Sequence, residues 1–189
     1  MYGAGRGRMR EILGQYTQTP PGELRFAYGA SGKPTLTYPA PSFAFNLSHT
    51  GAIAALAVAP VDALGLDIEA LRPLKEDIAR RYFSPAEVAA LEAHPPAART
   101  AAFYRCWTRK EAFVKATGDG LGFPLDAFDV SIDATNPPRL LRLAGTSASA
   151  LANWQLAHIG PDALPPDVVG AIAVKTADPG TGVTIRVRH

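Results

Sequence analysis

The sequence contains a single cysteine, Cys106, among its 189 residues. One cysteine excludes an intrachain disulfide and any zinc site built from several cysteines. The chain also has no apolar run of the roughly 18 residues needed to cross a bilayer. Its first ten residues are basic and glycine-rich, without the apolar segment of a secretory signal. We therefore expect a cytoplasmic protein with no membrane partner.

Charge of either sign is also scarce. Charged residues make up 19% of the chain and the formal net charge is +2, so nucleic-acid binding is not expected. The slight positive excess instead favours anionic ligands or acidic partners. Hydrophobic residues make up 47% of the chain, which is too many for a disordered protein and enough to build a core.

Apolar periodicity and turn residues predict an α+β protein with two similar α/β lobes, residues 1–72 and 73–189. Helices are expected over residues 8–16, 74–82 and 97–117, and after Ser84. Strands are expected over residues 24–27, 43–47, 52–59, 64–68, 127–132, 140–143, 154–159, 169–175 and 183–187. The strands at 52–59 and 64–68 are expected to pair as a hairpin.

Two helix ends carry explicit signals. Ser84-Pro-Ala-Glu87 is a capping box with proline at the first helical position, so a helix should begin there. Gly118 follows the long helix at 97–117 and is the residue that most readily ends one.

Paired carboxylates mark the first candidate site. In Gly65-Leu-Asp-Ile-Glu69, residues two apart on a strand share a face, so Asp67 and Glu69 point the same way. Two like charges side by side repel unless a cation or a basic group lies between them. The alternative is that this face of the sheet is simply exposed to solvent.

A third acid lies on the predicted helix at 97–117. Thr108, Glu111 and Lys115 are spaced at i, i+3 and i+7 and so form one stripe. This stripe could supply a carboxylate and an ammonium group to a site. It could equally be an ordinary surface ion pair between Glu111 and Lys115.

Ser48 and His49 precede the apolar strand at 52–59, and Lys33 with Pro34 lies in a turn. A hydroxyl, an imidazole and backbone N–H groups can bind phosphate. These residues could also be no more than turn and strand-entry positions.

Four motifs occur in a distinctive order, and the order is more specific than any one of them. They are Asn-Leu-Ser-His-Thr at 46–50, Gly-Leu-Asp-Ile-Glu at 65–69, Phe-Ser-Pro-Ala-Glu at 83–87 and Trp-Thr-Arg-Lys-Glu-Ala-Phe-Val-Lys at 107–115. With these motifs the chain resembles the 4′-phosphopantetheinyl transferase superfamily, in its larger, pseudo-dimeric type that activates surfactin synthetase. The resemblance implies an active site and cofactor at the interface of the two lobes.

The resemblance implies a role for each matching residue. Asp67, Glu69 and Glu111 would hold Mg²⁺, which Mn²⁺ can replace. The catalytic residues would be Asp67, Glu111 and Lys115. Coenzyme A, the co-substrate, would be bound by Arg10, Lys33, Pro34, Ser48, His49, Lys110 and Lys115.

The implied reaction is a phosphoryl transfer. A serine of an apo acyl or peptidyl carrier protein attacks the β-phosphorus of coenzyme A, and 3′,5′-ADP leaves. The cation and the lysines would stabilise charge on the pyrophosphate. Glu111 would take the serine proton, either directly or through a metal-bound water. Because its two lobes replace the two subunits of the smaller family type, we expect a monomer.

Two other functions use the same residues. A Mg²⁺-dependent hydrolase or nuclease would employ the carboxylates with water as the acceptor, and Lys33, Ser48 and His49 would then have no role. A non-catalytic coenzyme A-binding protein would fit a chain that starts close to the Arg10 helix, since the family usually has a longer segment there. The presence of every motif carboxylate and lysine favours the transferase.

The carrier protein could dock on residues 71–92. An acidic carrier helix would match the basic residues of this segment, and an apolar stripe recurs there at i, i+4 and i+8. The alternative is that the stripe lies in the core while the arginines are solvated. The basic residues are Arg72, Lys75, Arg80 and Arg81, and the stripe is Leu74, Ile78 and Tyr82.

Overall fold

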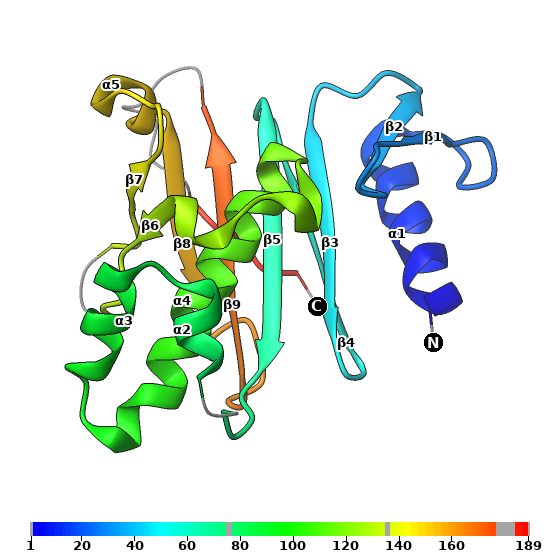
Figure 1. Cartoon of the computed structure of the whole chain (residues 1–189). Helices are drawn as coiled ribbons and strands as arrows, with labels where there is room; N and C mark the ends of the chain where they lie inside the picture. Colours follow the sequence, from blue (N-terminus) through cyan, green and yellow to red (C-terminus); the bar gives the residue numbers. More distant parts are fainter. Residues whose placement is uncertain (1, 75–76, 135–136, 177–183, 189) are drawn as a thin grey trace.

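A computed structural model of the chain describes residues 2–74, 77–134, 137–176 and 184–188. The fold is mixed α/β (Figure 1). The first elements are α1 (Tyr2–Thr17), β1 (Arg25–Tyr28), β2 (Pro34–Tyr38), β3 (Ala44–Thr50), β4 (Ile53–Ala59) and β5 (Ala63–Ala70). They are followed by α2 (Ile78–Tyr82), α3 (Pro85–Glu92), α4 (Pro96–Thr117), β6 (Phe128–Val130), β7 (Leu140–Leu143), α5 (Ala148–Leu151), β8 (Trp154–Ile159) and β9 (Val168–Lys175).

The largest sheet is antiparallel and has the strand order β5-β9-β8. Three separate two-stranded pairs, β1-β2, β3-β4 and β6-β7, surround it. The sheet joins β5 to strands about 100 residues further along the chain, with Ala63 opposite Lys175 and Ala70 opposite Val168. Strand β5 therefore belongs by its backbone hydrogen bonds to the C-terminal half.

The predicted hairpin between residues 52–59 and 64–68 is wrong. Strand β4 pairs over its whole length with β3, from Ala44 opposite Ala59 to Thr50 opposite Ile53. Gly51, with a φ of 56°, supplies the left-handed conformation that closes this tight turn. Strand β5 pairs instead with β9, which offers a ladder along its full length.

Both helix-end predictions are confirmed. The Ser84 hydroxyl accepts from the Glu87 N–H at 3.2 Å, and the Glu87 carboxylate accepts from the Ser84 N–H at 3.0 Å, so α3 begins with a complete capping box. Helix α4 ends at Gly118, which has a φ of 85°.

Other boundaries differ from the sequence predictions. Strand β2 was not expected, because Pro34 was interpreted as part of a turn, yet it opens a strand whose central residue, Leu36, is buried. The described part of the helix expected at 74–82 begins at Ile78. The strand expected at 183–187 is absent over residues 184–187, and Val183 lies outside the described residues.

Helix α4 packs across one face of β5 and β9 (Figure 1). Gly65 permits the close approach, because a Cβ at this position would overlap the carbonyl oxygen of Ala112 on α4. The opposite face of the sheet forms a separate apolar cluster that includes Leu66 and Ile68. The residues of β5 thus alternate between the α4 side and this second cluster, as the period of two requires.

A third apolar cluster joins α1 to β1, β2 and β3 and contains Met9, Leu13 and Phe45. The predicted lobe boundary after residue 72 leaves β5 in the first lobe, although its backbone ladder runs to β9. Side chains of β3 also bond to β5, so this strand is attached to both halves of the molecule. No helix in the described ranges has the length and apolar character needed to cross a membrane.

Candidate active site at the junction of β3, β5 and α4

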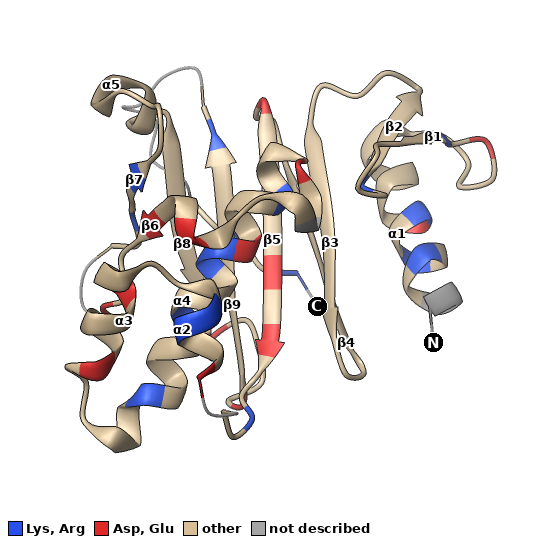
Figure 2. Ribbon diagram, viewed as in Figure 1, with Lys and Arg blue, Asp and Glu red and all other residues tan. Residues whose placement is uncertain are grey.

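Two acidic side chains of β5 lie on the side that carries α4. Asp67 and Glu69 follow Gly65 at intervals of two residues, and Gly65 lies directly against the α4 backbone. Glu111 and Lys115 are one helical turn apart on α4 and influence the charge of Asp67. Figure 2 shows acidic positions on β5 next to charged positions on α4.

The centre of the site is an ion pair between Lys115 and Asp67. The Lys115 ammonium lies 2.6 Å from Oδ1 of Asp67, and it also donates to the hydroxyl of Ser48 at 3.1 Å. The Ser48 hydroxyl donates to the same carboxylate oxygen at 3.3 Å. The Lys115 side chain keeps 31% of its surface exposed, so its ammonium can be reached from solvent.

Burial controls the ionisation of both central acids. Desolvation raises the pKa of Asp67 to about 7; Lys115 opposes the shift, and the charges of Glu111 and Glu69 add to it. Burial likewise raises the pKa of Glu111, with Lys115 opposing and Glu69 adding to the shift. The site therefore holds one carboxylate, that of Asp67, that can bind and release a proton close to neutral pH.

The donor set suits a hard dication. Oδ2 of Asp67 is buried and accepts no hydrogen bond within the described part of the chain. The neighbouring residues Glu69 and Glu111 are also acidic, so negative charge gathers around this oxygen. An oxygen-only set of this kind fits Mg²⁺, which commonly takes one or two carboxylates and completes its shell with water and phosphate. Among the described residues no three His, Cys, Asp or Glu side chains lie close enough together to hold a metal ion, so the structure does not assemble Asp67, Glu69 and Glu111 into a three-carboxylate site.

A seam of side chains connects β3 to β5 and replaces a backbone ladder between them. Residues 46, 48 and 50 of β3 are buried polar residues spaced two apart, and they accept hydrogen bonds from alternate N–H groups of β5. The bonds are Leu66 N–H to Asn46 at 2.8 Å, Ile68 N–H to Ser48 at 3.2 Å and Ala70 N–H to Thr50 at 3.1 Å.

The sequence analysis did not identify Asn46 and Thr50 as part of the site. The signal was present: alternate polar residues at 46, 48 and 50 have the same period as the strand at 66, 68 and 70. The sequence does not identify their partner strand. These side chains bond to its backbone N–H groups, which every residue other than proline has, so the bonds require no particular residue types in that strand.

Lys33 lies at the C-terminal end of α4. Its ammonium donates to the carbonyl oxygens of Leu64 at 3.0 Å and Lys115 at 2.5 Å, and burial lowers its pKa. The Ser31 hydroxyl donates to the carbonyl of Gly118 at 2.9 Å. A cation against the last carbonyls of a helix is stabilised by the helix dipole. This turn therefore fixes the β1-β2 hairpin to the helix that carries Lys115.

The remaining predicted cofactor contacts lie further from this centre. The Arg10 guanidinium donates to the carbonyl oxygens of Pro21 at 2.9 Å and Leu24 at 2.6 Å, within the N-terminal part of the fold. Pro34 opens β2. His49 follows Ser48 along β3 and is exposed, so it projects from the opposite side of the strand.

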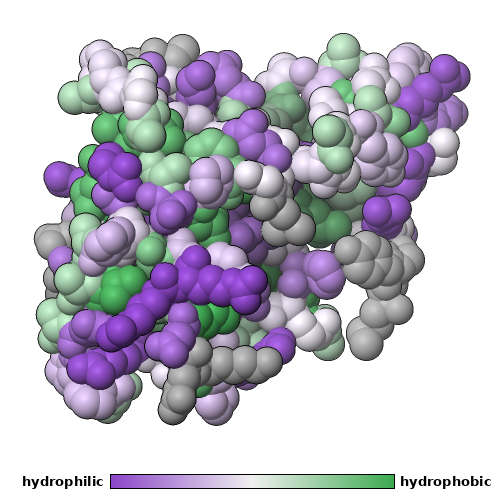
Figure 3. Space-filling model, in the orientation of Figure 1, coloured by the Kyte–Doolittle hydropathy of each residue, from purple (hydrophilic) through white to green (hydrophobic). Residues whose placement is uncertain are grey.

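The segment predicted to dock a carrier protein resolves into two parts. The side chains of Leu74, Ile78 and Tyr82 are partly buried and pack against the main apolar core. Arg80 is exposed and pairs with Glu92 at 2.7 Å, and the Arg81 guanidinium lies over the Tyr82 ring. Figure 3 shows hydrophilic side chains over α2 on this face. Lys75 lies outside the described residues.

The structure does not bring Lys110 to the site, which corrects its expected role as a phosphate contact. Its side chain has no exposed surface, and its ammonium lies 2.8 Å from the carboxylate of Glu87. It also donates to the carbonyl oxygens of Leu125 at 2.7 Å and Phe128 at 2.5 Å. Lys110 could reach a phosphate only by breaking all of these bonds.

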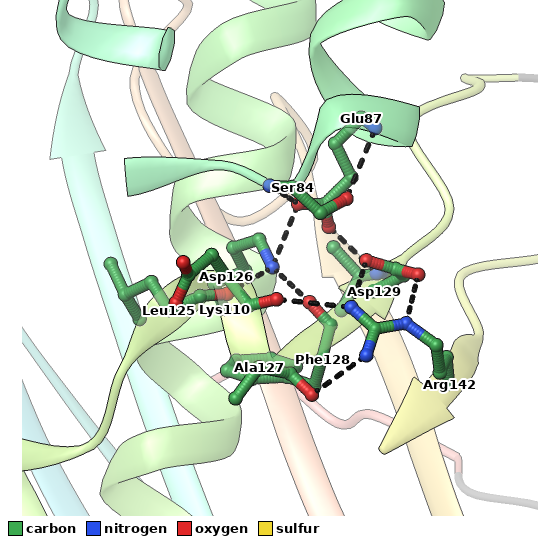
Figure 4. A network of polar contacts seen from close by, with 10 residues as sticks. Ser84, Glu87, Lys110, Leu125, Asp126, Ala127, Phe128, Asp129 and Arg142 are labelled. Carbon is green, nitrogen blue, oxygen red and sulfur yellow. Dashed lines mark hydrogen bonds and ion pairs between the residues drawn. The ribbon is translucent and has the colours of Figure 1, made fainter. Parts of the chain in front are cut away.

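Glu87 is the hub of this second network (Figure 4). Besides Lys110, its carboxylate accepts from the N–H groups of Ser84 at 3.0 Å and Val130 at 2.9 Å. Nearby, Asp129 accepts from Arg142 at 2.6 Å. The network joins α3 and β6 to α4. The capping box predicted from the sequence therefore also supplies a buried anion, which sequence reasoning did not identify.

Comparison with known proteins places these residues in a family. The family model for the 4′-phosphopantetheinyl transferase superfamily matches residues 63–173, more than half of the chain. The chain is 38% identical over 175 residues to the 4′-phosphopantetheinyl transferase HetI of Nostoc sp., covering 90% of this chain and 69% of that protein.

Other relatives match a shorter region. The chain is 36% identical over 126 residues to the 4′-phosphopantetheinyl transferase Sfp of Bacillus subtilis, covering 66% of this chain and 54% of that protein. It thus spans about half the length of some relatives and about two thirds of HetI. Among solved structures, the holo-[acyl-carrier-protein] synthase of Thermotoga maritima aligns with a TM-score of 0.45 and 18% identity, covering 60% of this chain and 62% of that one.

Proposed function

Because the chain belongs to the 4′-phosphopantetheinyl transferase superfamily, we propose that it transfers the 4′-phosphopantetheine moiety of coenzyme A to a serine of an apo carrier protein, acyl or peptidyl, and releases 3′,5′-ADP. The observation that carries the proposal is the contact of Lys115 with Asp67, with Glu69 and Glu111 as charged neighbours. These four residues come from β5 and α4, which both lie within the matched region.

The divalent cation is part of the proposal. Asp67, Glu69 and Glu111 would hold Mg²⁺ or Mn²⁺, and the unpartnered Oδ2 of Asp67 supports this. When bound, the cation supplies positive charge to the pyrophosphate of coenzyme A. Lys115 is the positively charged partner of Asp67. Its exposed ammonium can turn toward a phosphate once Asp67 has another positive partner.

The side chains around the ion pair suit the rest of the reaction. Ser48 and Lys115 lie side by side and offer a hydroxyl and an ammonium to phosphate oxygens. Glu111 would accept the proton of the attacking serine. Burial raises its pKa, which makes its carboxylate a better base than an ordinary glutamate near neutral pH. The other predicted coenzyme A contacts, Arg10, Lys33, Pro34 and His49, stay predictions.

We also propose that the chain forms two lobes, residues 1–72 and 73–189, with the active site at their junction, and that it acts as a cytoplasmic monomer. The support is that Ser48 comes from one predicted lobe and Lys115 from the other, while β5 bonds to both halves. Because one chain contributes both sides of this site, a single copy can supply all of these residues.

The direct experiment incubates the protein with coenzyme A, Mg²⁺ and an apo carrier protein, and measures the intact mass of the carrier. We expect the carrier to gain one phosphopantetheine, and a carrier whose acceptor serine is changed to alanine to gain nothing. A hydrolase would consume coenzyme A without modifying the carrier. A non-catalytic binder would leave both molecules unchanged, and either result would contradict the proposal.

A further inference from the structure

The seam between β3 and β5 contains a hydrogen-bond arrangement that occurs twice. In the first copy, the Ser48 hydroxyl accepts from the N–H of Ile68 at 3.2 Å and donates to Oδ1 of Asp67, the residue just before it, at 3.3 Å. One hydroxyl is thus bonded to the backbone of one residue and to the carboxylate of its predecessor. Nothing in the proposed reaction requires the second copy.

The second copy lies two residues further along both strands. The Thr50 hydroxyl accepts from the N–H of Ala70 at 3.1 Å and lies 3.4 Å from Oε2 of Glu69. An ionised carboxylate can only accept, so the single O–H of Thr50 must be the donor in the contact with Glu69. The N–H of Ala70 fixes the hydroxyl oxygen in place, which aims that O–H at Glu69.

The seam has a third rung that lacks a carboxylate. Asn46 accepts from the N–H of Leu66 at 2.8 Å, but the residue before Leu66 is Gly65, which has no side chain. Asn46 therefore accepts a hydrogen bond from the β5 backbone as Thr50 does, but it has no carboxylate of a preceding residue to contact. A comparison of Asn46 with Thr50 therefore distinguishes joining the two strands from contacting a carboxylate.

We propose that Thr50 is a positioning residue: it orients the carboxylate of Glu69 toward the divalent cation. This inference rests on the proposed function, which makes Glu69 a ligand. Glu69 is only partly buried and its side chain is long, so without a partner it would sample several rotamers. The hydrogen bond from Thr50 to Oε2 of Glu69 restricts these rotamers and would leave the other carboxylate oxygen available to a cation.

The test measures Mn²⁺ binding in the presence of saturating coenzyme A, with free Mn²⁺ followed by electron paramagnetic resonance. Thr50→Val keeps the shape of the side chain and removes the hydroxyl. We expect its dissociation constant for Mn²⁺ to rise roughly 3- to 10-fold. This is at or below the smallest effects usual for residues that orient a metal ligand, because the bond from Thr50 to Glu69 is long. Thr50→Ser restores the hydroxyl and should restore the affinity to within about twofold of wild type.

Asn46→Ala is the matched control for a purely structural role. It removes a buried rung of the same seam, so it should lower the unfolding midpoint in urea at least as much as Thr50→Val does. Its Mn²⁺ affinity should nevertheless stay within about twofold of wild type.

Three results would overturn the inference. Thr50→Val could bind Mn²⁺ like wild type, Thr50→Ser could be as weak as Thr50→Val, or Asn46→Ala could lose as much affinity as Thr50→Val. A wild-type protein that binds no Mn²⁺ beside coenzyme A would instead contradict the metal assignment in the proposed function, and the inference with it.

Discussion

Two lysines of α4, five residues apart, each bind a carboxylate, but in opposite surroundings. Lys110 and Glu87 form a fully buried pair, with side-chain exposures of 0% and 3%. Lys115 and Asp67 form a pair whose lysine keeps 31% of its side chain exposed. The first pair also satisfies the carbonyl groups of Leu125 and Phe128 and the N–H of Val130, whereas the second lies beside an unpartnered carboxylate oxygen.

The difference separates a residue of the fold from a residue of the site. A buried ammonium with three acceptors cannot leave them without leaving Glu87 as an uncompensated buried charge. A lysine whose side chain is about one third exposed can exchange its partner at little cost. The family resemblance gave the two lysines the same expected role in phosphate binding, and only the packing of α4 against its neighbours distinguishes them.

The largest expected effect is on the stability of the Lys110 pair. Lys110→Met leaves Glu87 buried without its cation, so the free energy of unfolding should fall by about 3–5 kcal/mol. Lys115→Met should cost much less, because the pKa of Asp67 is already raised to about 7 and a proton can replace the lysine. Urea unfolding of the two variants measures both values. Equal losses would remove the distinction between the pairs.

A paired substitution sharpens this prediction. Glu87→Gln combined with Lys110→Met removes both charges. Ser84 and Val130 donate to different oxygens of Glu87, so the single oxygen of glutamine can accept from one of these two N–H groups. Since replacing a whole buried ion pair is often close to neutral, we expect the double variant to be more stable than Lys110→Met alone. A double variant less stable than Lys110→Met would show that loss of Lys110 does not leave a destabilising buried charge on Glu87.

The next largest effect concerns the acids around Lys115. Asp67→Ala and Glu111→Ala should lower the rate of carrier modification by about 10²–10³-fold, as expected when a preorganised charged group is lost from an active site. Circular dichroism spectra should stay those of the wild type. If either variant keeps a near-normal rate in Mg²⁺, the acidic residue concerned is not part of the reaction.

Asp67 should also make stability depend on pH. Its pKa is about 7 when folded and 3.8 ordinarily, so the folded protein keeps a proton that the unfolded chain releases. The stabilisation is fully present below pH 3.8 and is lost as pH rises through about 7. Lys115 and Glu111 on α4 and Glu69 on β5 face this group.

Asp67→Asn cannot titrate and isolates this contribution. Relative to the variant, the wild type should lose about 1–3 kcal/mol of unfolding free energy between about pH 5 and 8, because over about two pH units of this range the folded carboxyl is protonated while the unfolded one is ionised. Urea unfolding at the two pH values measures the difference. A difference that is constant, or that grows in favour of the wild type at high pH, would show that Asp67 is ionised throughout.

The smallest effect is expected far from both lysine pairs. If an acidic carrier docks on α2, reversing charge with Arg80→Glu and Arg81→Glu should raise the apparent KM for the carrier several-fold and leave that for coenzyme A unchanged. Both arginines border the core rather than the Asp67 site. An unchanged KM for the carrier would exclude α2 from the interface.

Local signals predicted local structure well. The Ser84 capping box and Gly118 each carry the geometry of a helix end in a few adjacent residues, and both helix ends are where the sequence puts them. The alternation in Gly65-Leu-Asp-Ile-Glu69 placed both acids on one face for the same reason. Such features depend on residues within one turn or one strand.

The features that escaped prediction depend on distant partners. Strand β5 pairs with β9 rather than with β4, which precedes it in the sequence. Its partner thus lies about 100 residues further along the chain, where local sequence signals do not reach. The partner of Lys110 is Glu87, for which the sequence predicted only a role in the capping box. The alternating polar residues that include Thr50 could be seen in the sequence, but their partner could not, because the two bonds of Thr50 reach a strand 20 residues further along the chain.

The contrast between the two lysines is tested most directly by calorimetric titration of coenzyme A into two variants at low and high salt. Lys115→Met should bind coenzyme A about tenfold more weakly, with the larger loss at low salt, since the contact joins opposite charges. The double variant Glu87→Gln with Lys110→Met should bind it like wild type. Normal binding by Lys115→Met together with weak binding by the double variant would contradict the account.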